Sequence, residues 1–186
     1  MFLLAGLGNK GKKYLDTRHN VGFNVIDKLI AQYEFKTEKK NLNSHTFRGI
    51  INENKIILLK PMTFMNNSGK SVLEISSFYK IPKKRIFIIH DDVDLSVARV
   101  KVKCGGSDGG HNGIKSIDRH IANDYYRIRI GIGKPDNFIQ VKDYVLKKFT
   151  TYERNKVNKK TDILIKNISY LLKYDINNFL NVVSRD

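Results

Sequence analysis

The sequence predicts an α/β fold, a single domain with a mixed, mostly parallel, twisted sheet and helices on both of its faces. Short apolar segments such as FLLAG and IFII alternate with segments of helical period, and this order is typical of a sheet covered on both sides. The 186 residues suffice to bury a hydrophobic core without disulfides. Because no repeat, low-complexity tract or Pro/Gly/Ser-rich linker interrupts the chain, we expect residues 1–186 to form one domain.

The first part of the chain alternates between strand and helix patterns. The segment from Asn20 to Tyr33 carries apolar residues on one broad face, which indicates a helix, and Pro82 ends a second helix. Residues 36–45 are rich in Lys and Asn and indicate a loop. In order, we expect a buried strand in FLLAGLG (2–8), a polar loop (9–18), a helix (20–33), a loop (36–45), two strands around a turn at 52–54 (46–60) and a helix (70–80).

The second part continues the alternation and ends in helices. Apolar and polar residues alternate in ARVKVK, so Lys101 and Lys103 share one face of a strand. In order, we expect strands in IFIIHDD (86–92) and ARVKVK (98–103), a glycine-rich loop (104–113), a short helix to Ile121, a strand in YRIRIGIG (126–133) and helical structure from about Phe138 onward.

Composition favours a polyanionic partner and a reducing compartment. Lys and Arg outnumber Asp and Glu by 34 to 18, a formal net charge of +16, which suits binding to phosphates. The alternative is a coding bias, since the chain is also rich in Asn and Ile. The single Cys104 excludes an internal disulfide and fits the cytoplasm. No apolar run approaches the ~18–20 residues of a membrane helix, so we expect no membrane partner.

Two short motifs resemble nucleotide-binding loops but lack parts that such loops need. GLGNKG (6–11) matches G-x-G-x-x-G, yet no helix opens within it and no strand ending in an acidic residue follows at the required distance. SGKS (68–71) lacks the glycine that a phosphate-binding P-loop carries five positions before Gly69, because that position is Phe64. We therefore expect neither a dinucleotide site nor a P-loop.

Polar side chains follow the predicted strands at the edge of the sheet where ligands bind in α/β folds. They are Asn9, Asn66, Asp91 and Asn112, and His19 ends the loop after the first strand. A neutral His accepts a proton from water near pH 7, an Asp on its other nitrogen fixes the tautomer, and amide N–H groups stabilise an oxyanion. The set favours hydrolysis of an acyl bond by activated water.

Each of these residues also has a structural explanation. Asn after a strand is a common turn former, and a single His is more often a surface or capping residue. We interpret His45 and His120 in that way and His90 as packed on an apolar strand. Residue chemistry alone indicates a hydrolase and does not separate His19 from His90 or His111.

Four longer sequence motifs carry a resemblance to a known family of hydrolases. GLGNKGKKYLDTRHNVG (6–22) closely resembles the first signature of bacterial peptidyl-tRNA hydrolases. KPMTFMNNSGKSV (60–72), FIIHDDVDL (87–95) and GGSDGGHNGIKSI (105–117) followed by RIRIGIGKP (127–135) are similar to the further signatures in order and spacing. The resemblance covers almost the whole chain to about residue 150.

The resemblance implies that the chain hydrolyses the ester joining a peptide to the 3′ ribose of tRNA, recycling tRNA from prematurely released chains. It implies no cofactor and no metal, and a mobile C-terminal helical lid over the cleft; we expect a monomer. His19 would be the general base, Asp91 the carboxylate that holds it, and Asn9 the residue that distinguishes a peptide-bearing amino acid from a free one. The implied contacts to substrate and the tRNA 3′ end are Tyr14, Phe64, Asn66 and Asn112, and those to tRNA phosphates are Lys101, Lys103 and Arg129.

Two departures from the family pattern concern loops. Lys10 stands where the family usually has Pro, so the loop loses a fixed φ and gains a charge. The segment 96–98, Ser-Val-Ala, replaces a Pro- and Gly-containing turn and leaves the path into ARVKVK undefined. Neither removes a reacting group, so we expect activity to be retained.

Two other functions remain open at this point. A non-catalytic RNA-binding protein would explain the net charge and the Lys-rich stretch from Lys147 to Lys160. A metal-dependent hydrolase would use His90, Asp91, Asp92 and Asp94, although alternate side chains of a strand point to opposite faces.

Overall fold

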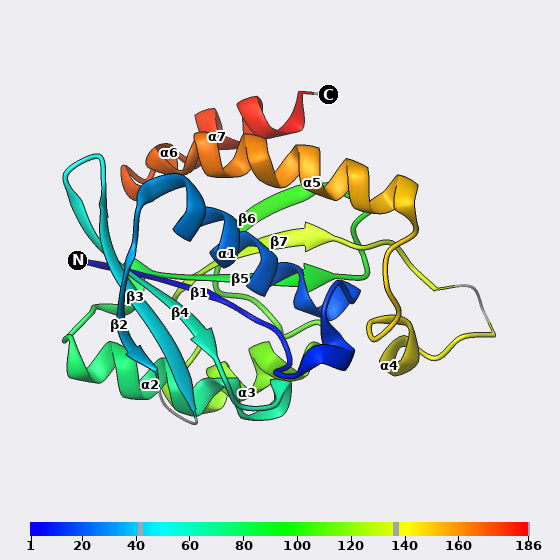
Figure 1. The fold of residues 1–186 in the computed structure, drawn as a ribbon, viewed down its shortest axis with the longest axis horizontal. Helices are drawn as coiled ribbons and strands as arrows, with labels where there is room; N and C mark the ends of the chain where they lie inside the picture. The colour runs from blue at the N-terminus through cyan, green and yellow to red at the C-terminus, as the bar shows by residue number, and fades with distance from the viewer. Residues whose placement is uncertain (41–42, 136–137, 186) are drawn as a thin grey trace.

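A seven-stranded sheet forms the centre of the computed structural model, which describes residues 1–40, 43–135 and 138–185 (Figure 1). The strands lie in the order β2-β3-β4-β1-β5-β7-β6. Their bounds are β1 (Phe2–Gly6), β2 (Lys36–Lys40), β3 (Ser44–Ile51), β4 (Asn54–Pro61), β5 (Ile86–Asp92), β6 (Val100–Cys104) and β7 (Tyr126–Gly131).

The sheet is mixed, with a parallel centre. Strands β4, β1, β5 and β7 run parallel to one another, whereas β2, β3 and β6 join at the edges as antiparallel strands. The parallel strands read as continuous apolar runs because helices cover both of their faces. Asn52 and Glu53 have φ of 43° and 66°, the conformation of a two-residue hairpin turn, which confirms the turn between β3 and β4.

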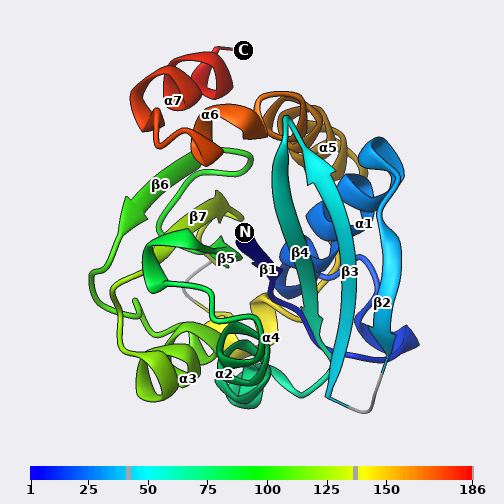
Figure 2. The same ribbon diagram turned by 90° about the vertical axis from the view of Figure 1, so that its left-hand side faces the viewer.

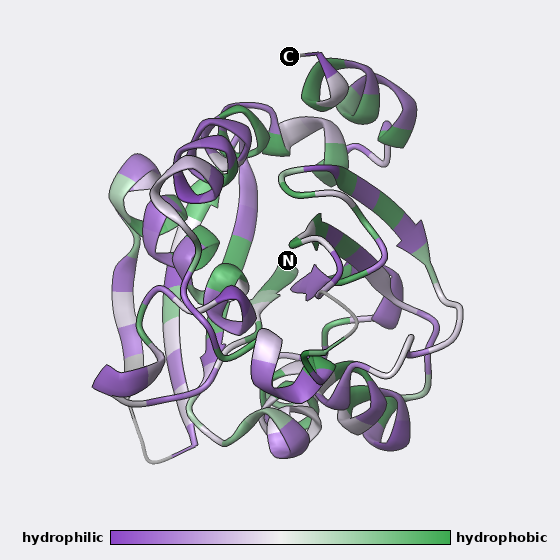
Figure 3. Cartoon of the chain, turned by 90° about the vertical axis from the view of Figure 1, so that its right-hand side faces the viewer, coloured by the Kyte–Doolittle hydropathy of each residue, from purple (hydrophilic) through white to green (hydrophobic). Residues whose placement is uncertain are grey.

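Two layers of helices cover the sheet (Figure 2). Helices α1 (Val21–Tyr33), α5 (Thr151–Lys166), α6 (Ile168–Leu172) and α7 (Ile176–Ser184) lie on one face, and α2 (Ser68–Phe78) and α3 (Asn112–Ile121) lie on the other. Figure 3 shows hydrophobic positions on the strands between these layers. The remaining helices are short: α4 (Val141–Tyr144) and the 3-10 turns η1 (Lys12–Tyr14), η2 (Arg18–Asn20), η3 (Met65–Asn67) and η4 (Lys83–Arg85).

The sequence-based assignment needs one correction and one refinement. Residues 36–40, predicted as part of a loop, form the edge strand β2, which pairs antiparallel with β3. Its polar sequence, KTEKK, has no apolar alternation, so backbone pairing rather than burial holds it; residues 41 and 42 of the same predicted loop lie outside the described residues. The refinement concerns the predicted C-terminal lid. Of the described helices α4–α7, α5–α7 pack on the sheet, and α4 supplies residues to the cavity that also contains His19.

The turn before β6 contains a non-glycine residue with a positive φ angle. Ala98 adopts φ of 68°, a left-handed conformation that glycine adopts more easily. Its N–H donates to the carbonyl of Gly131, and the Arg99 N–H donates to the carbonyl of Ser96. The path into β6 is therefore defined by hydrogen bonds to the end of β7. Among the described residues, no helix has the length and apolarity that crossing a bilayer would need.

Helix α1 crosses the sheet at very short range, and this crossing carries the loop that holds His19. A Cβ atom on Gly22 would lie 2.4 Å from the carbonyl oxygen of Ile89 and 2.4 Å from the N atom of Leu7. Close by, the Leu7 N–H donates to the carbonyl of Ile89, and the Phe23 N–H donates to the carbonyl of Leu7. Backbone on three segments is thus in contact, and only glycine fits between them.

Replacing Gly22 with Ala should therefore lower the free energy of unfolding by about 3 kcal/mol, because the colliding atoms are backbone and cannot turn away. Urea unfolding followed by circular dichroism measures this change. Asn24→Ala on the same helix is the matched control, with an expected change within about 0.5 kcal/mol. A Gly22→Ala chain as stable as the control would contradict the close crossing.

Candidate active site

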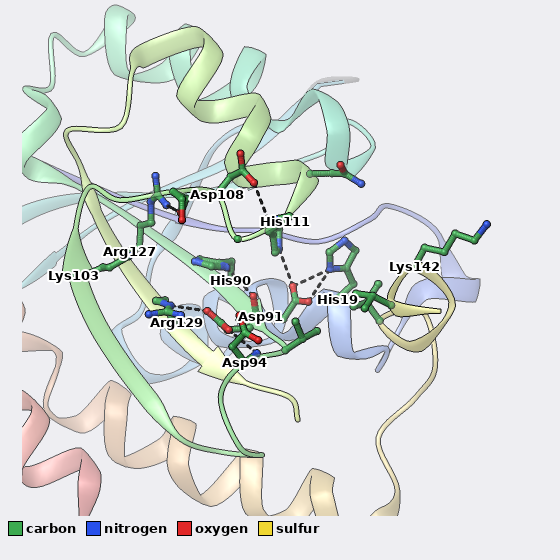
Figure 4. A pocket seen from close by; sticks show the side chains of 18 residues that line it. His19, His90, Asp91, Asp94, Lys103, Asp108, His111, Arg127, Arg129 and Lys142 are labelled. Atoms are coloured by element: carbon green, nitrogen blue, oxygen red, sulfur yellow. Dashed lines mark hydrogen bonds and ion pairs between the residues drawn. The ribbon is translucent and has the colours of Figure 1, made fainter. Parts of the chain in front are cut away.

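The loop after β1 and the end of β5 place a histidine beside a carboxylate (Figure 4). His19 lies in η2, directly before α1, and Asp91 lies near the end of β5. The Nδ1 atom of His19 is 2.8 Å from Oδ1 and 2.9 Å from Oδ2 of Asp91. Both residues are buried, at 8% and 2% exposure. The pairing expected from the sequence is therefore present in the fold.

A second histidine, to which the sequence assigned no role, completes the arrangement. Nε2 of His111 lies 3.0 Å from Oδ1 of Asp91, and its Nδ1 accepts the N–H groups of Gly113 and Ile114 at the start of α3. A ring whose Nδ1 accepts carries its proton on Nε2 when neutral, so His111 donates to Asp91. Its position between a glycine pair and a predicted helix is the sequence signal that could have revealed this capping role.

Electrostatics reinforce the pairing. Burial by itself would lower the pKa of His19, but the adjacent Asp91 carboxylate outweighs it and raises the pKa above the ordinary 6.5. Burial opposes ionisation of Asp91, yet His19 and His111 hold the pKa of that carboxyl far below its usual range. Asp91 therefore stays ionised and keeps the proton of neutral His19 on Nδ1, which leaves the lone pair on Nε2.

His19 lines a cavity of about 290 Å³. One end holds His19, Asp91 and residues of the α4 region (Val141, Lys142 and Val145), and the other end holds Lys103, Arg127 and Arg129. The glycine-rich loop, residues 107–112, lines it between these ends. Figure 4 shows Lys103, Arg127 and Arg129 on one side of His90 and Asp91, and His19 and Lys142 on the other. One end of the cavity thus holds the His19–Asp91 pair, and the other, the cationic end, holds three basic side chains.

The side-chain amide of Asn9 is oriented by a bond to its oxygen, and no described residue accepts a hydrogen bond from its Nδ2. Its Oδ1 accepts the N–H of Met65 at 2.9 Å. Its backbone is fixed by Asn20, which accepts the Asn9 N–H at 2.8 Å and donates to the Asn9 carbonyl at 3.0 Å. Because a backbone N–H can meet only the oxygen end of the amide, Nδ2 must point away from Met65. Asn9 therefore presents a fixed donor.

Of the other predicted contacts, Asn112 lines the cavity, whereas Tyr14, Phe64 and Asn66 are not among its lining residues. Asn112, the first residue of α3, lines the cavity and is exposed. Asn66 in η3 and Phe64 directly before it are exposed, and Tyr14 at the end of η1 is half-buried. Lys10, the departure from the family pattern, places its Nζ 5.7 Å from the centre of the Phe64 ring. The residue that replaces Pro thus contributes a cation beside an exposed aromatic ring.

The predicted phosphate contacts divide into two groups. Lys103 and Arg129 line the cavity, whereas Lys101 is exposed on β6 directly across from Arg129. Nε of Arg129 donates to Asp92 at 2.5 Å, which fixes the guanidinium by one edge. Arg127 also lines the cavity but is 1% exposed and ion-paired with Asp118, so we assign it a structural role.

The side chains of the alternative metal site in HDDVD bind other protein groups. Asp92 pairs with Arg129 and Asp94 with Lys134, while His90 hydrogen-bonds to the carbonyl of Asp91. His19, Asp91 and His111 do converge, with ligand atoms within 4.8 Å of one another. However, Nδ1 of His111 caps α3, so Nε2 could bind a metal only as an imidazolate or after giving up the cap. The donor set fits a hydrogen-bonded base better than a metal ion.

The fold and the site together define a class of protein, a single α/β domain in which a buried histidine–carboxylate pair lines a cavity. Comparisons with known proteins identify the family. A family model described as peptidyl-tRNA hydrolase matches residues 3–186, and the chain therefore belongs to the peptidyl-tRNA hydrolase family.

Relatives and solved structures agree over nearly the full length. The chain is 45% identical over 184 residues to the peptidyl-tRNA hydrolase of Rickettsia canadensis, covering 98% of this chain and 100% of the relative. It is 45% identical over 183 residues to that of Wolbachia pipientis wMel, with 98% and 100% coverage. The crystal structure of peptidyl-tRNA hydrolase from Acinetobacter baumannii is similar with a TM-score of 0.92 and 35% identity, covering 98% of this chain and 94% of that one.

The raised pKa of His19 predicts the acid limb of the activity. The base must be neutral, so kcat/KM should fall as the pH drops through the pKa of His19, which lies above 6.5 because of Asp91. Asp91→Asn should move this limb to lower pH and reduce kcat by roughly 10²–10⁴-fold, because the tautomer is no longer fixed. Rate profiles between pH 5 and 9 on the substrate proposed below measure both; an acid limb unchanged in Asp91→Asn would contradict the pairing.

Proposed function

We propose that this chain, a peptidyl-tRNA hydrolase, cleaves the ester of peptidyl-tRNA with a water molecule that His19 deprotonates. Nε2 of His19 takes a proton from water as its oxygen bonds to the ester carbonyl carbon. The carbon–oxygen bond to the 3′ ribose then breaks, and the departing oxygen takes the proton back from His19, giving tRNA. The peptide is released as a carboxylic acid, which loses the second water proton to solvent and becomes a carboxylate. The observation that carries this proposal is the double contact of His19 Nδ1 with Asp91.

Asp91 serves this reaction as a permanent counter-charge. When His19 becomes an imidazolium, the buried carboxylate at 2.8 Å stabilises it. The Nε2–H of His111 at 3.0 Å keeps Asp91 from rotating away. His111 therefore acts as a positioning residue, because it holds the Asp91 carboxylate in place.

Asn9 supplies selectivity for a blocked amino acid. Its Nδ2 donor is fixed by the Oδ1 contact to Met65 and suits the carbonyl of the peptide bond that precedes the ester. A free aminoacyl-tRNA offers an ammonium group there, which leaves the donor without an acceptor, and an unpaired polar group of this kind is costly. Asn9 thereby favours the peptide-bearing substrate.

The tRNA side of the substrate suits the cationic end of the cavity and its rim. Lys103 and Arg129 would bind phosphate within the cavity, and Lys101 would meet the backbone outside it. The single-stranded 3′ end suits the exposed ring of Phe64, since bases stack on aromatic side chains. Asn112 lines the cavity, and Tyr14 and Asn66 would complete the proposed contacts.

We further propose that residues 1–186 act as one monomeric domain in the cytoplasm, without a cofactor or a metal. The α4 segment would serve as the mobile wall of the cleft. Exhaustive chelation should leave the activity unchanged, because no step of the proposed reaction requires an ion. A chelated preparation that regains activity on adding a divalent cation would contradict this part of the proposal.

Replacing His19 with Ala should abolish ester cleavage while tRNA binding is largely kept. The measurement is release of the acyl group from N-acetylated aminoacyl-tRNA, with unblocked aminoacyl-tRNA as the control substrate. Loss of a general base lowers kcat by roughly 10²–10⁴-fold. His120→Ala, at an exposed histidine of α3, is the matched control with full activity. Retained turnover in His19→Ala would overturn the assignment of His19 as the base. A chain that only bound RNA would cleave neither substrate, with or without the substitution.

Salt dependence tests the phosphate contacts one residue at a time. Replacing Lys101, Lys103 or Arg129 with Ala should reduce the slope of log affinity against log salt by roughly one unit, since one phosphate contact is lost. Lys83→Ala is the control, because Lys83 is exposed in η4 at the opposite end of β5 from Asp91. A residue whose replacement leaves the slope unchanged does not contact a phosphate.

A further inference from the structure

The residue before the base is a buried arginine whose bonds reach the far end of the chain. Arg18 is 6% exposed. Its Nη2 donates to both carboxylate oxygens of Glu153 at 3.0 and 2.8 Å. Its Nη1 donates to the carbonyls of Lys147 and Lys148 at 3.3 and 2.7 Å. The two terminal nitrogens of the guanidinium thus bind groups that lie about 130 positions away in the sequence, whereas Nε has no partner among the described residues.

Aromatic rings enclose the same guanidinium. Its carbon lies 4.3 Å from the centre of the Tyr144 ring and 5.2 Å from that of Phe149. Tyr144 ends α4, and Phe149 lies between α4 and α5. Arginine favours such stacked, bidentate positions because its donors are planar and rigid. Lysine could not reproduce this set of contacts.

The backbone repeats the same connection. The Arg18 N–H donates to the carbonyl of Lys147, and the His19 N–H donates to the carbonyl of Val145 at 2.9 Å. Thr17 and Lys148 form an isolated antiparallel bridge. Val145 and Val141 also line the cavity that contains His19. The base and the opposing wall of the cleft are therefore parts of one bonded assembly.

A buried ion pair of this kind contributes more to geometry than to stability, because desolvation offsets much of its attraction. Glu153 is itself anchored, since its Oε2 accepts the N–H of Thr150 and the Thr150 hydroxyl accepts the Glu153 N–H. This capping box fixes the carboxylate to the first turn of α5. The pair consequently ties the His19 turn to the first turn of α5.

We propose that Arg18 and Glu153 are positioning residues, which hold the His19 turn against the α4 segment so that the base faces Asp91 and the cleft wall at once. The inference rests on the proposed role of His19 as the base. When the pair is broken, the α4–α5 connection separates from η2, and the imidazole loses its alignment with the carboxylate. The pair therefore couples the arrangement of the cleft wall to that of the base.

Glu153→Gln is the decisive variant, because Gln also completes a capping box while the charge facing Arg18 is removed. We expect kcat on N-acetylated aminoacyl-tRNA to fall about tenfold, in line with one misplaced catalytic group, with KM changed little. The acid limb of kcat/KM should move to lower pH as the Asp91 contact loosens. Arg18→Lys should behave in the same way.

Two control variants separate positioning from general stability. Thr150→Ala weakens the cap of α5 but leaves the Arg18–Glu153 contact. Asp162→Asn breaks the Lys28–Asp162 pair, which also joins α1 to α5 but lies away from η2. Both should keep the wild-type acid limb and kcat, even where the melting temperature falls. Equal shifts in these controls and in Glu153→Gln would overturn the proposal, as would an unchanged acid limb and kcat in Glu153→Gln.

Titration of the His19 imidazole by NMR gives a readout that does not require turnover. The pKa of His19 in Glu153→Gln should lie below that of the wild-type chain. If the wild-type chain failed to cleave peptidyl-tRNA but the His19 pKa still moved, the proposed function would fail and the positioning role would stand. If the chain cleaved its substrate and the pKa did not move, only the positioning role would fail.

Discussion

The Asp91 carboxylate is the group on which the rest of the site depends. It is buried at the end of β5, where an uncompensated negative charge would be costly. His19 and His111 supply the two donors that make its ionisation favourable. In return, the carboxylate fixes the tautomer of His19 and raises the pKa of that base. Each of the three residues requires the other two in place.

Three separate parts of the fold deliver these residues. The close crossing of α1 over β1 and β5 at Gly22 brings η2, and with it His19, to the end of the sheet. The cap of α3 orients His111, and the contacts of Arg18 bind the η2 turn to the start of α5. The residues of the site are few, but segments from the start, the middle and the end of the chain hold them, which suits the accurate alignment that the proposed general base requires.

Local patterns predicted most elements because burial and period coincide there. The parallel strands are apolar on both faces, and α1 has a broad apolar face, so both could be identified. The strand β2 was missed because KTEKK has no apolar alternation and depends on pairing with β3. The motifs singled out His19 and Asp91 and placed Asn9 and Asn112 near them, but they gave no role to His111, whose function depends on a helix cap and a carboxylate 20 positions away.

The sequence by itself determined the alternating α/β architecture, the family to which the chain belongs and the residue types available for chemistry, because these follow from local pattern and long motifs. Only the tertiary structure decided which histidines share Asp91, that Lys101 lies outside the cavity lined by Lys103 and Arg129, and that Arg18 joins the base to α5. These facts depend on distances between segments far apart in the chain. Packing of the whole core sets these distances, and no single stretch of the sequence specifies them.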